Sequence, residues 1–522
     1  MNKKTFFLLL MAGLLFFAGN AQNHTVPGIE LEFVPNDGSH YPNLSNNKWD
    51  NKVSVYKDLT YNSFYRRSLG WNGGDGIYST LLPDGNVFWS FADSFFGALE
   101  PNRVRNGGKS NLPRNGAFIQ TDESFDGFVC LNELVQTKYS YMSTYYKGKT
   151  WLRHPEGEKT LEQINVGEVD SDMIYWPGDA TVYHGETGDT LQLLWGQISE
   201  GMVRSETAYT EYTLEGQLGD EGYMKLVKYE RYFQPYTTNY GSGIFEDEDG
   251  HTYLYGNHDF YPVVARTETR DLKSKWTYYI KGTDNQWSWV PGETEEEIDY
   301  IKSRMTASKI SNGWIGQPNM FKYLDKYYLI GQEALGPQVW MWQGDTPWGP
   351  FTNSKRKMIY VTGAITPKDK PNEPAVTYNT FLHVQMSKKG ELCFSYNPNP
   401  VDFADNFNAE GSADLYTPFF VRIFDWHLLW NVPNPDPTAI HTKEIDEMLS
   451  VYPNPATDVL KISSATESPF RWKLSNLIGA CLQSGQSTSG ETNIAVSNYV
   501  PGVYLLQVET QSGTQLHKFI KK

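Results

Sequence analysis

The sequence GWNGGDGIYS at residues 70–79, followed by VFWSFADSF at residues 87–95, contains the pattern on which the fold prediction rests. The turn PDGN at residues 83–86 separates an apolar segment from a second segment rich in aromatic side chains. Two such segments joined by a turn that contains Pro, Asp and Gly are typical of an antiparallel β-hairpin. The stretch therefore predicts two paired strands, with Asp75 just before the first strand and Asp93 just after the second.

Four further hairpins of the same kind are predicted along the chain. They occupy residues 180–195, 242–255, 318–330 and 380–396. Helical periodicity is scarce outside the charged stretch at residues 293–309. Because antiparallel sheets repeated around an axis leave only short edges, recurring hairpins are typical of a β-propeller. We therefore expect an all-β chain in which residues 22–430 form a five-bladed β-propeller with an insertion between its first two blades. A two-sheet sandwich is the alternative.

The composition favours a large folded core and argues against a nucleic-acid partner. Aromatic residues make up 15% of the 522 residues, which is too many for a disordered polar chain. The 45 basic and 61 acidic side chains give a formal net charge of −16, whereas binding to phosphates requires a basic face. The three cysteines are widely spaced and cannot all pair, so we expect no disulfide framework.

Both ends of the chain carry features of an exported protein. Residues 1–21 combine two lysines, a short apolar run and small residues, which is typical of a secretory signal peptide. The apolar run is too short to span a bilayer comfortably, so we expect no transmembrane segment in the mature chain. An N-terminal membrane anchor is the alternative. The closely spaced prolines of NVPNPDP at residues 431–437 predict a linker over residues 431–448, because they exclude helix and central strand.

The last segment, residues 449–522, contains three blocks in a fixed order: YPNPA at residues 452–456, GVYLL at 502–506 and the basic end KFIKK at 518–522. These blocks resemble the C-terminal sorting domain of the type IX secretion system of Bacteroidetes. The resemblance implies a small β-sandwich that is recognised by the type IX secretion machinery, and a protein that is secreted or displayed on the outer cell surface. Short alternating strands between Gly, Ser and Asn turns also fit a sandwich. A carbohydrate-binding sandwich is the alternative.

Four acidic residues flank the predicted hairpins and are candidates for catalysis. Asp75 and Asp179 precede the first strands of the first and second hairpins, each after a glycine, whereas Asp93 and Glu333 follow second strands. In a propeller the residues before each first strand converge at one end of the axis, and the two later acids need not share that end. Glycoside hydrolysis uses two carboxyl groups, one protonated and one ionised, and neighbouring acids raise each other's pKa. For each acid the alternative is a turn residue or a structural hydrogen-bond acceptor.

Aromatic and polar side chains near the blade starts are candidates for substrate binding, because aromatic rings stack on sugar rings. The candidates are Trp71, Trp176, Tyr240, His258, Asp259, Arg266, Trp314 and Gln317. The alternatives are packing between blades for the aromatic rings, a loop pair for His258 and Asp259, and a buried ion pair for Arg266. No linear metal motif is present and we expect no cofactor, although a propeller channel can hold a structural or central cation.

The runs at residues 70–79 and 88–95, YGSGI at residues 240–244 and the fourth hairpin resemble the Bacteroidetes domain-of-unknown-function family 5005. The resemblance extends over residues 45–430. That family is in turn similar to the five-bladed propeller glycosidases of family 43, in which an Asp of the first blade is the base, an Asp of the second tunes the pKa and a Glu of the third is the acid.

Asp75 and Asp179 match the first two of these positions, but the third blade begins YGS at residues 240–242 and has no Glu. If the chemistry is that of family 43, the resemblance implies that Asp93 or Glu333 supplies the proton; the alternative is a different chemistry. We predict a secreted glycoside hydrolase that acts on an extracellular polysaccharide through carboxylates at the propeller centre. The alternatives are a non-catalytic glycan-binding propeller and a structural surface protein.

Overall fold

The computed structural model describes residues 24–121, 127–140, 143–155, 173–199, 202–388, 390–435, 449–464, 469–476, 481–510 and 513–522. The predicted signal peptide and residues 436–448 of the expected linker lie outside these ranges. The chain forms two compact units, Met1–Thr442 and Lys443–Lys522. No helix within the described ranges is long and apolar enough to cross a membrane.

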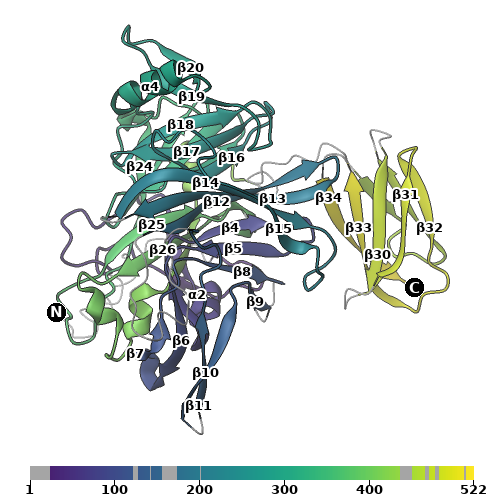
Figure 1. Cartoon of the computed structure of the whole chain (residues 1–522). Helices are drawn as coiled ribbons and strands as arrows, with labels where there is room; N and C mark the ends of the chain where they lie inside the picture. Colours follow the sequence, from purple (N-terminus) through teal and green to yellow (C-terminus); the bar gives the residue numbers. More distant parts are fainter. Residues whose placement is uncertain are drawn as a thin grey trace, which may run out of the picture. The chain divides into compact units, whose positions relative to one another are not determined.

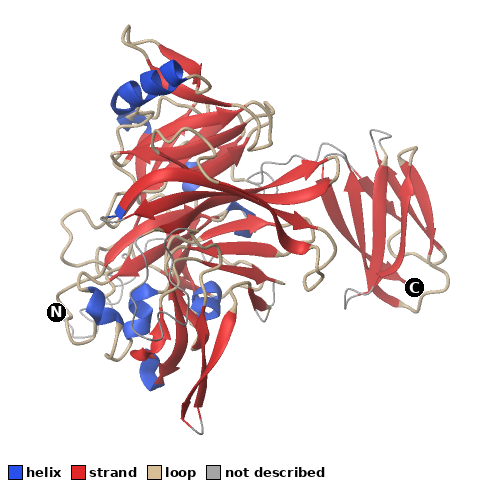
Figure 2. Ribbon diagram, in the orientation of Figure 1, coloured by secondary structure: helices blue, strands red, loops and turns tan. Residues whose placement is uncertain are grey.

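All five predicted hairpins are present in the first unit as antiparallel strand pairs, and the expected all-β architecture is confirmed (Figures 1 and 2). The pairs are β4 (Tyr78–Leu81) with β5 (Val87–Phe91), β12 (Ile174–Gly185) with β13 (Gly188–Ser199), β16 (Asn239–Glu246) with β17 (Thr252–His258), β21 (Asn319–Tyr323) with β22 (Lys326–Gln332), and β25 (Val376–Leu382) with β26 (Leu392–Asn399).

Each hairpin extends into a larger antiparallel sheet. The first sheet adds β8 (Gly116–Gln120) and β9 (Phe128–Cys130), and the second adds β14 (Val203–Leu214) and β15 (Tyr223–Glu230). The third adds β18 (Tyr261–Thr267), β19 (Trp276–Lys281) and β20 (Trp287–Pro291), and the fourth adds β23 (Gln338–Gly344) and β24 (Arg356–Val361). The fifth adds β27 (Phe419–Phe424), β2 (Ser54–Asp58) and β1 (Leu31–Phe33).

The fifth sheet joins the two ends of the first unit, because β2 from the N-terminal part pairs with β27 from the C-terminal part. A buried arginine reinforces this junction. Arg422 Nε donates a hydrogen bond to Asp58 Oδ2 at 2.7 Å, and Arg422 also pairs with Glu391. The other Asp58 oxygen caps helix α2 (Leu59–Tyr65), so one carboxylate links the junction to the helix that follows it.

The segment between the first two hairpins, where an insertion was expected, contributes strands to two small sheets. In one, β6 (Ser94–Glu100) and β7 (Val104–Asn111) join β3 (Leu69–Gly74), which precedes the first hairpin, and the other consists of β10 (Leu134–Ser140) and β11 (Ser143–Gly148). Helix α4 (Glu295–Arg304) lies within the charged stretch where helical periodicity was found, and Thr294 and Glu297 form a capping box at its start. Short 3-10 helices are η1 (Pro101–Arg103), η3 (Met305–Ala307), η4 (Asn353–Lys355), η5 (Val384–Met386), η6 (Phe403–Asn406), η7 (Ser412–Tyr416) and η8 (Trp426–Leu429).

The apolar core lies between successive sheets and connects them in circular order. Each of five buried clusters contains side chains from two sheets: Phe88 of the first with Leu193 of the second, Leu194 of the second with Leu254 of the third, Tyr255 of the third with Leu329 of the fourth, Phe321 of the fourth with Phe394 of the fifth, and Phe420 of the fifth with Trp89 of the first. The fifth sheet therefore packs against both the fourth and the first.

The second unit contains two antiparallel sheets with a common apolar core. One sheet consists of β28 (Leu449–Tyr452), β29 (Val459–Ser464) and β32 (Glu491–Ala495), and the other of β30 (Phe470–Asn476), β31 (Cys481–Ser487), β33 (Gly502–Thr510) and β34 (Gly513–Lys521). The YPNPA block contacts the basic end of the chain. Ala456 N donates to Ile520 O at 2.8 Å, and Lys522 N donates to Ala456 O at 2.9 Å.

Candidate active site

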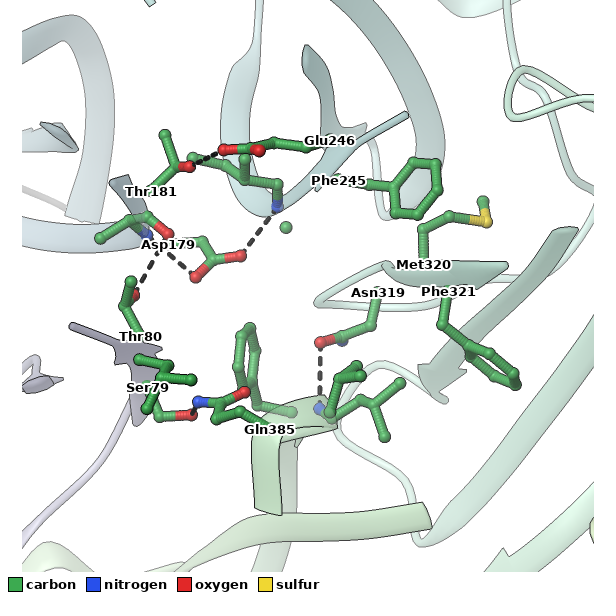
Figure 3. A pocket seen from close by; sticks show the side chains of 17 residues that line it. Ser79, Thr80, Asp179, Thr181, Phe245, Glu246, Asn319, Met320, Phe321 and Gln385 are labelled. Carbon is green, nitrogen blue, oxygen red and sulfur yellow. Dashed lines mark hydrogen bonds between the residues drawn. The ribbon is translucent and has the colours of Figure 1, made fainter. Parts of the chain in front are cut away.

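The first strands of the five hairpins, which are β4, β12, β16, β21 and β25, line one cavity of about 200 Å³ (Figure 3). Its wall combines apolar side chains with a set of polar ones, which are Ser79, Thr80, Asp179, Thr181, Glu246, Asn319 and Gln385. Thr181 Oγ1 donates to Glu246 across the boundary between the second and third sheets. The first strands of the five hairpins therefore meet around one cavity.

Asp179 is the one predicted carboxylate that lines this cavity. A register shift between Pro177 and Ala180 in β12 marks a β-bulge at Asp179, and a Cβ at Gly178 would lie only 2.5 Å from Gly241 O. The Asp179 oxygens accept hydrogen bonds from Ala180 N at 2.9 Å and from Ile244 N at 2.8 Å. Burial raises the pKa of Asp179 to about 7, although these two N–H groups lower it.

Asp75 and Asp93 lie side by side at the same end of the first hairpin. Asp75 N donates to Asp93 O at 3.2 Å, and Ala92 N donates to Asp75 O at 2.8 Å. Antiparallel pairing puts the start of a first strand beside the end of its second strand. Glu333 follows the same rule, because it forms an isolated antiparallel bridge with Ile315, just before β21. Asp93 and Glu333, which follow second strands, therefore lie at the same hairpin end as the residues that precede the first strands.

The Asp75 carboxyl group is held by a tyrosine and lies close to a second carboxylate. Tyr378 OH donates to Asp75 Oδ2 at 2.6 Å. Burial and the nearby charge of Asp93 raise the pKa of Asp75 to about 7, whereas Tyr378 and Tyr416 act in the opposite direction. Asp75 can therefore exchange a proton near neutral pH.

The Asp93 carboxylate is paired with a positive charge and with an indole. Arg114 Nη1 donates to Asp93 Oδ2 at 3.2 Å, and Trp176 Nε1 donates to Asp93 Oδ1 at 3.1 Å. Trp176 belongs to the second sheet, so Asp93 connects the first hairpin with its neighbour. The site thus combines a carboxyl group that exchanges a proton with a carboxylate that is ion-paired.

Tyr78 connects the Asp75 side of the site with Asp179. Its phenol is buried, it lies next to the Gln317 amide, and burial raises its pKa. The charges of Arg204, Asp179 and Asp75 all act on this hydroxyl group. Gln317, predicted from sequence as a binding residue, lies next to Tyr78, whereas Tyr78 and Arg204 were not among the predicted residues.

Two of the predicted aromatic binding residues are buried in the core. Trp71 is 2% exposed and packs against Tyr65 and Phe91, and Tyr240 is 6% exposed and packs against Tyr278. Neither ring is exposed for stacking on a sugar. Packing, which the sequence analysis gave as the alternative, describes the positions of both.

Three other predicted residues form a separate patch at the end of β17: His258 is its last residue, Asp259 follows it, and Trp314 comes from the segment before β21. Trp314 is 48% exposed, its Nε1 donates to Asp259 O at 3.1 Å, and its ring meets Phe260 edge to face with centroids 5.2 Å apart. Asp259 and Phe260 both have positive φ, of 50° and 63°. His258 Nε2 lies 3.6 Å from Asp259 Oδ2. None of these residues lines the cavity.

The last two predicted residues also lie away from the cavity. Arg266 stands on β18, the third strand of its sheet, with its guanidinium 4.2 Å from the centre of the Trp289 ring. The Glu333 charge acts on Arg356. Among the described residues, no group of three or more His, Cys, Asp or Glu side chains is placed to hold a metal ion.

Comparison with known proteins identifies the family. Residues 58–426 match the model of the domain of unknown function DUF5005. The chain belongs to the DUF5005 family. The DUF5005 match contains all five hairpins and every predicted site residue. Residues 450–522 match the secretion system C-terminal sorting domain, which indicates type IX secretion to the outside or to the cell surface.

The DUF5005 region also has a counterpart among solved structures. A "putative hydrolase" from Bacteroides ovatus is 37% identical, with 80% of this chain and 100% of that chain covered and a TM-score of 0.69. Similarity is far lower to two other structures. An exo-β-1,3-galactanase from Phanerochaete chrysosporium is 8% identical, with 87% of this chain and 98% of that chain covered and a TM-score of 0.35. A GH43_1 enzyme from Xanthomonas citri is 11% identical, with 70% of this chain and 92% of that chain covered and a TM-score of 0.34. No curated protein matches.

Proposed function

We propose that this DUF5005 protein is a secreted glycoside hydrolase that cleaves an extracellular polysaccharide at the carboxyl groups of Asp75, Asp93 and Asp179. The observation that carries the proposal is the Asp75–Asp93 pair. These two residues are joined by a backbone hydrogen bond of 3.2 Å, and their carboxyl groups have different surroundings. One is buried against a tyrosine hydroxyl and the other is paired with an arginine.

We also propose that the five sheets are the blades of a β-propeller and that residues 449–522 form a β-sandwich. Two observations support the propeller. The first strand of every sheet contributes to the same cavity, and the apolar clusters connect the sheets in circular order with the fifth beside the first. A propeller would place Asp75 and Asp179 at corresponding positions of adjacent blades.

The proposed chemistry divides the work between an acid and a carboxylate. Hydrolysis of a glycosidic bond needs one carboxyl group to protonate the leaving oxygen and one carboxylate to act as base or nucleophile. Because burial and the Asp93 charge raise its pKa to about 7, Asp75 holds its proton well above the usual range of a carboxyl group and serves as the proton donor. Asp93 is the charged partner, and Asp179, whose pKa is also about 7, tunes the charge of the centre.

This assignment differs from the role that the family 43 resemblance implies for Asp75, which is that of the base. The reason is its environment: burial and the Asp93 charge both favour the protonated form of Asp75. The hydrolase description of the Bacteroides ovatus protein, at 37% identity, supports the reaction class.

The proposal is tested by reducing-sugar release from arabinan, galactan and host glycans by the mature chain. We expect release from at least one of them, and a loss of about 10²–10⁴-fold in Asp75→Asn, the usual contribution of a general acid. Asp325→Asn, in the exposed turn of the fourth hairpin, is the matched control and should keep full activity. Binding to these glycans without release by the intact chain would instead identify a glycan-binding protein.

A further inference from the structure

The guanidinium of Arg204 approaches the site from the outer part of the second sheet. Arg204 is near the start of β14 and pairs with Ile198 of β13. Its side chain passes over Gly196, where an added Cβ would lie 3.1 Å from Arg204 Nη1. Gly196 pairs in turn with Trp176 of β12, and the Arg204 guanidinium lies 5.7 Å from the centre of the Trp176 ring. The glycine thus leaves room for the arginine to reach the first strand.

Among the residues that the structure describes, Arg204 has no acidic partner, in contrast to Arg422 and Arg231. Arg422 donates to Asp58 Oδ2 at 2.7 Å, and Arg231 donates to Glu206 Oε2 at 3.0 Å. Within the described ranges, no carboxylate lies within ion-pair distance of Arg204, and the charged or titratable groups that act on it are two tyrosine phenols. Burial lowers the pKa of its guanidinium. Arg204 is only partly buried, so a guanidinium without a carboxylate partner is open to an anion supplied by a ligand.

The position of Arg204 puts such an anion within reach of the reacting bond. Trp176, next to the guanidinium, donates its Nε1 to Asp93 Oδ1 at 3.1 Å. The charges of Arg204, Asp75 and Asp179 all act on the hydroxyl group of Tyr78. A sugar ring bound against Trp176 with its bond at Asp75 and Asp93 would direct one substituent toward Arg204. A guanidinium binds carboxylate and sulfate groups through paired hydrogen bonds.

We propose that the substrate of this site is an anionic glycan, whose carboxylate or sulfate group is bound by Arg204 beside Trp176. This inference rests on the proposed function and narrows it to a substrate class. The protein's own charge of −16 does not favour such a ligand, so the positive charge of Arg204 in the site must provide the selectivity.

The test measures binding by calorimetry to the full-length Asp75→Asn protein, which does not consume its ligand. The probes are tetragalacturonate and its methyl ester, and a sulfated galactan tetrasaccharide and its desulfated form. We expect an anionic probe to bind at least tenfold more tightly than its neutral counterpart. The preferred pair identifies the anion as carboxylate or sulfate. In Arg204→Gln combined with Asp75→Asn, this preference should fall below twofold.

Arg356→Gln in the same background is the matched control, because the Arg356 guanidinium also lies over an indole, 4.0 Å from the centre of the Trp340 ring, but stands on β24 of the fourth sheet. It should keep the preference. Three results would overturn the inference. They are equal affinity for the charged and neutral probes, an equal loss of affinity for both kinds of probe in Arg204→Gln, and no binding of either anionic probe. Release of neutral sugars from the polysaccharide panel would then still support the proposed glycosidase activity. A failure of the anionic-substrate inference can therefore be distinguished from a failure of the proposed function.

Discussion

Asp75 and Asp93 are joined through their backbones, with Asp75 N donating to Asp93 O at 3.2 Å, and the charge of Asp93 contributes to the raised pKa of Asp75. The pairing follows directly from the hairpin: the two acids lie at the same, open end of an antiparallel pair that the strands hold in register. Fixed carboxyl groups whose environments differ can hold a proton on one and a charge on the other, which is the state that glycoside hydrolysis requires.

The hydroxyl of Tyr378 tunes this pair, and its removal should shift the pH dependence of activity. Tyr378 OH donates to Asp75 Oδ2 at 2.6 Å and thereby lowers the pKa of Asp75. In Tyr378→Phe we expect the limb of the pH–kcat/KM profile that reports Asp75 to move to higher pH. Tyr328→Phe, whose hydroxyl accepts a hydrogen bond from Gln343, is the control. An unchanged profile in Tyr378→Phe would contradict the assignment of Asp75.

The raised pKa of Asp179 should make folding stability depend on pH. Its folded-state pKa of about 7 exceeds the ordinary value of 3.8, so its contribution to stability is fully present below about pH 4 and is lost as the pH rises through 7. We expect Asp179→Asn to lose less stability than the parent between pH 4 and 8, by roughly 2–4 kcal/mol. Urea unfolding at several pH values measures this difference. Parallel curves of unfolding free energy against pH for the two proteins would show that the pKa of Asp179 is not raised.

The buried arginine at the junction of β2 and β27 should be essential for stability. Arg422 pairs with Asp58 and Glu391, and all three side chains are fully buried. Arg422→Ala leaves two buried acids without their partner and should cost about 3–5 kcal/mol in urea unfolding. Lys57→Ala is the control. It removes the exposed ion pair between Lys57 of β2 and Glu32 of β1, and it should cost about 1 kcal/mol or less. Similar losses in the two variants would contradict the role of the buried pair.

Trp314 is the exposed aromatic residue among the predicted binding residues, and we expect it to contact polysaccharide outside the cavity. Trp314→Ala should raise the KM for a long polysaccharide by about 2–10-fold, the contribution of one stacked ring, with kcat unchanged. Tyr300→Ala, which removes a 37% exposed ring from α4, is the control and should leave KM unchanged. Equal KM values for Trp314→Ala and the parent would show that this patch does not bind substrate.

The hairpins could be predicted from the sequence because their signals are local. A Pro, Asp and Gly turn between two aromatic-rich segments specifies the β4–β5 pair, and the position of Asp75 and Asp93 at its open end follows from antiparallel register. The burial of Trp71 could not be predicted in the same way. In a chain with 15% aromatic residues, a ring in the core and a ring at a binding surface have the same local sequence pattern.

The residues that the sequence analysis missed reach the site through tertiary packing. Arg204 comes from the third strand of the second sheet and Tyr416 from a 3-10 helix, and no short-range pattern links either to Asp75. The position of Tyr378 could have been noticed in the sequence, because Tyr378 comes just before the fifth predicted hairpin and Asp75 comes just before the first. Helix α2 was also missed, since its seven residues are too few for a helical period and its start depends on the Asp58 cap.

The most direct test of the account compares kcat/KM of Asp75→Asn and Asp93→Asn with that of Asp325→Asn on the polysaccharide that the mature chain cleaves. Both site variants replace a carboxyl group with an amide of the same shape, so the backbone hydrogen bond between them should persist. The account predicts losses of about 10²–10⁴-fold in both, with Asp325→Asn unaffected. Turnover by either site variant within twofold of the control would contradict the assignment of the Asp75–Asp93 pair as the hydrolytic centre.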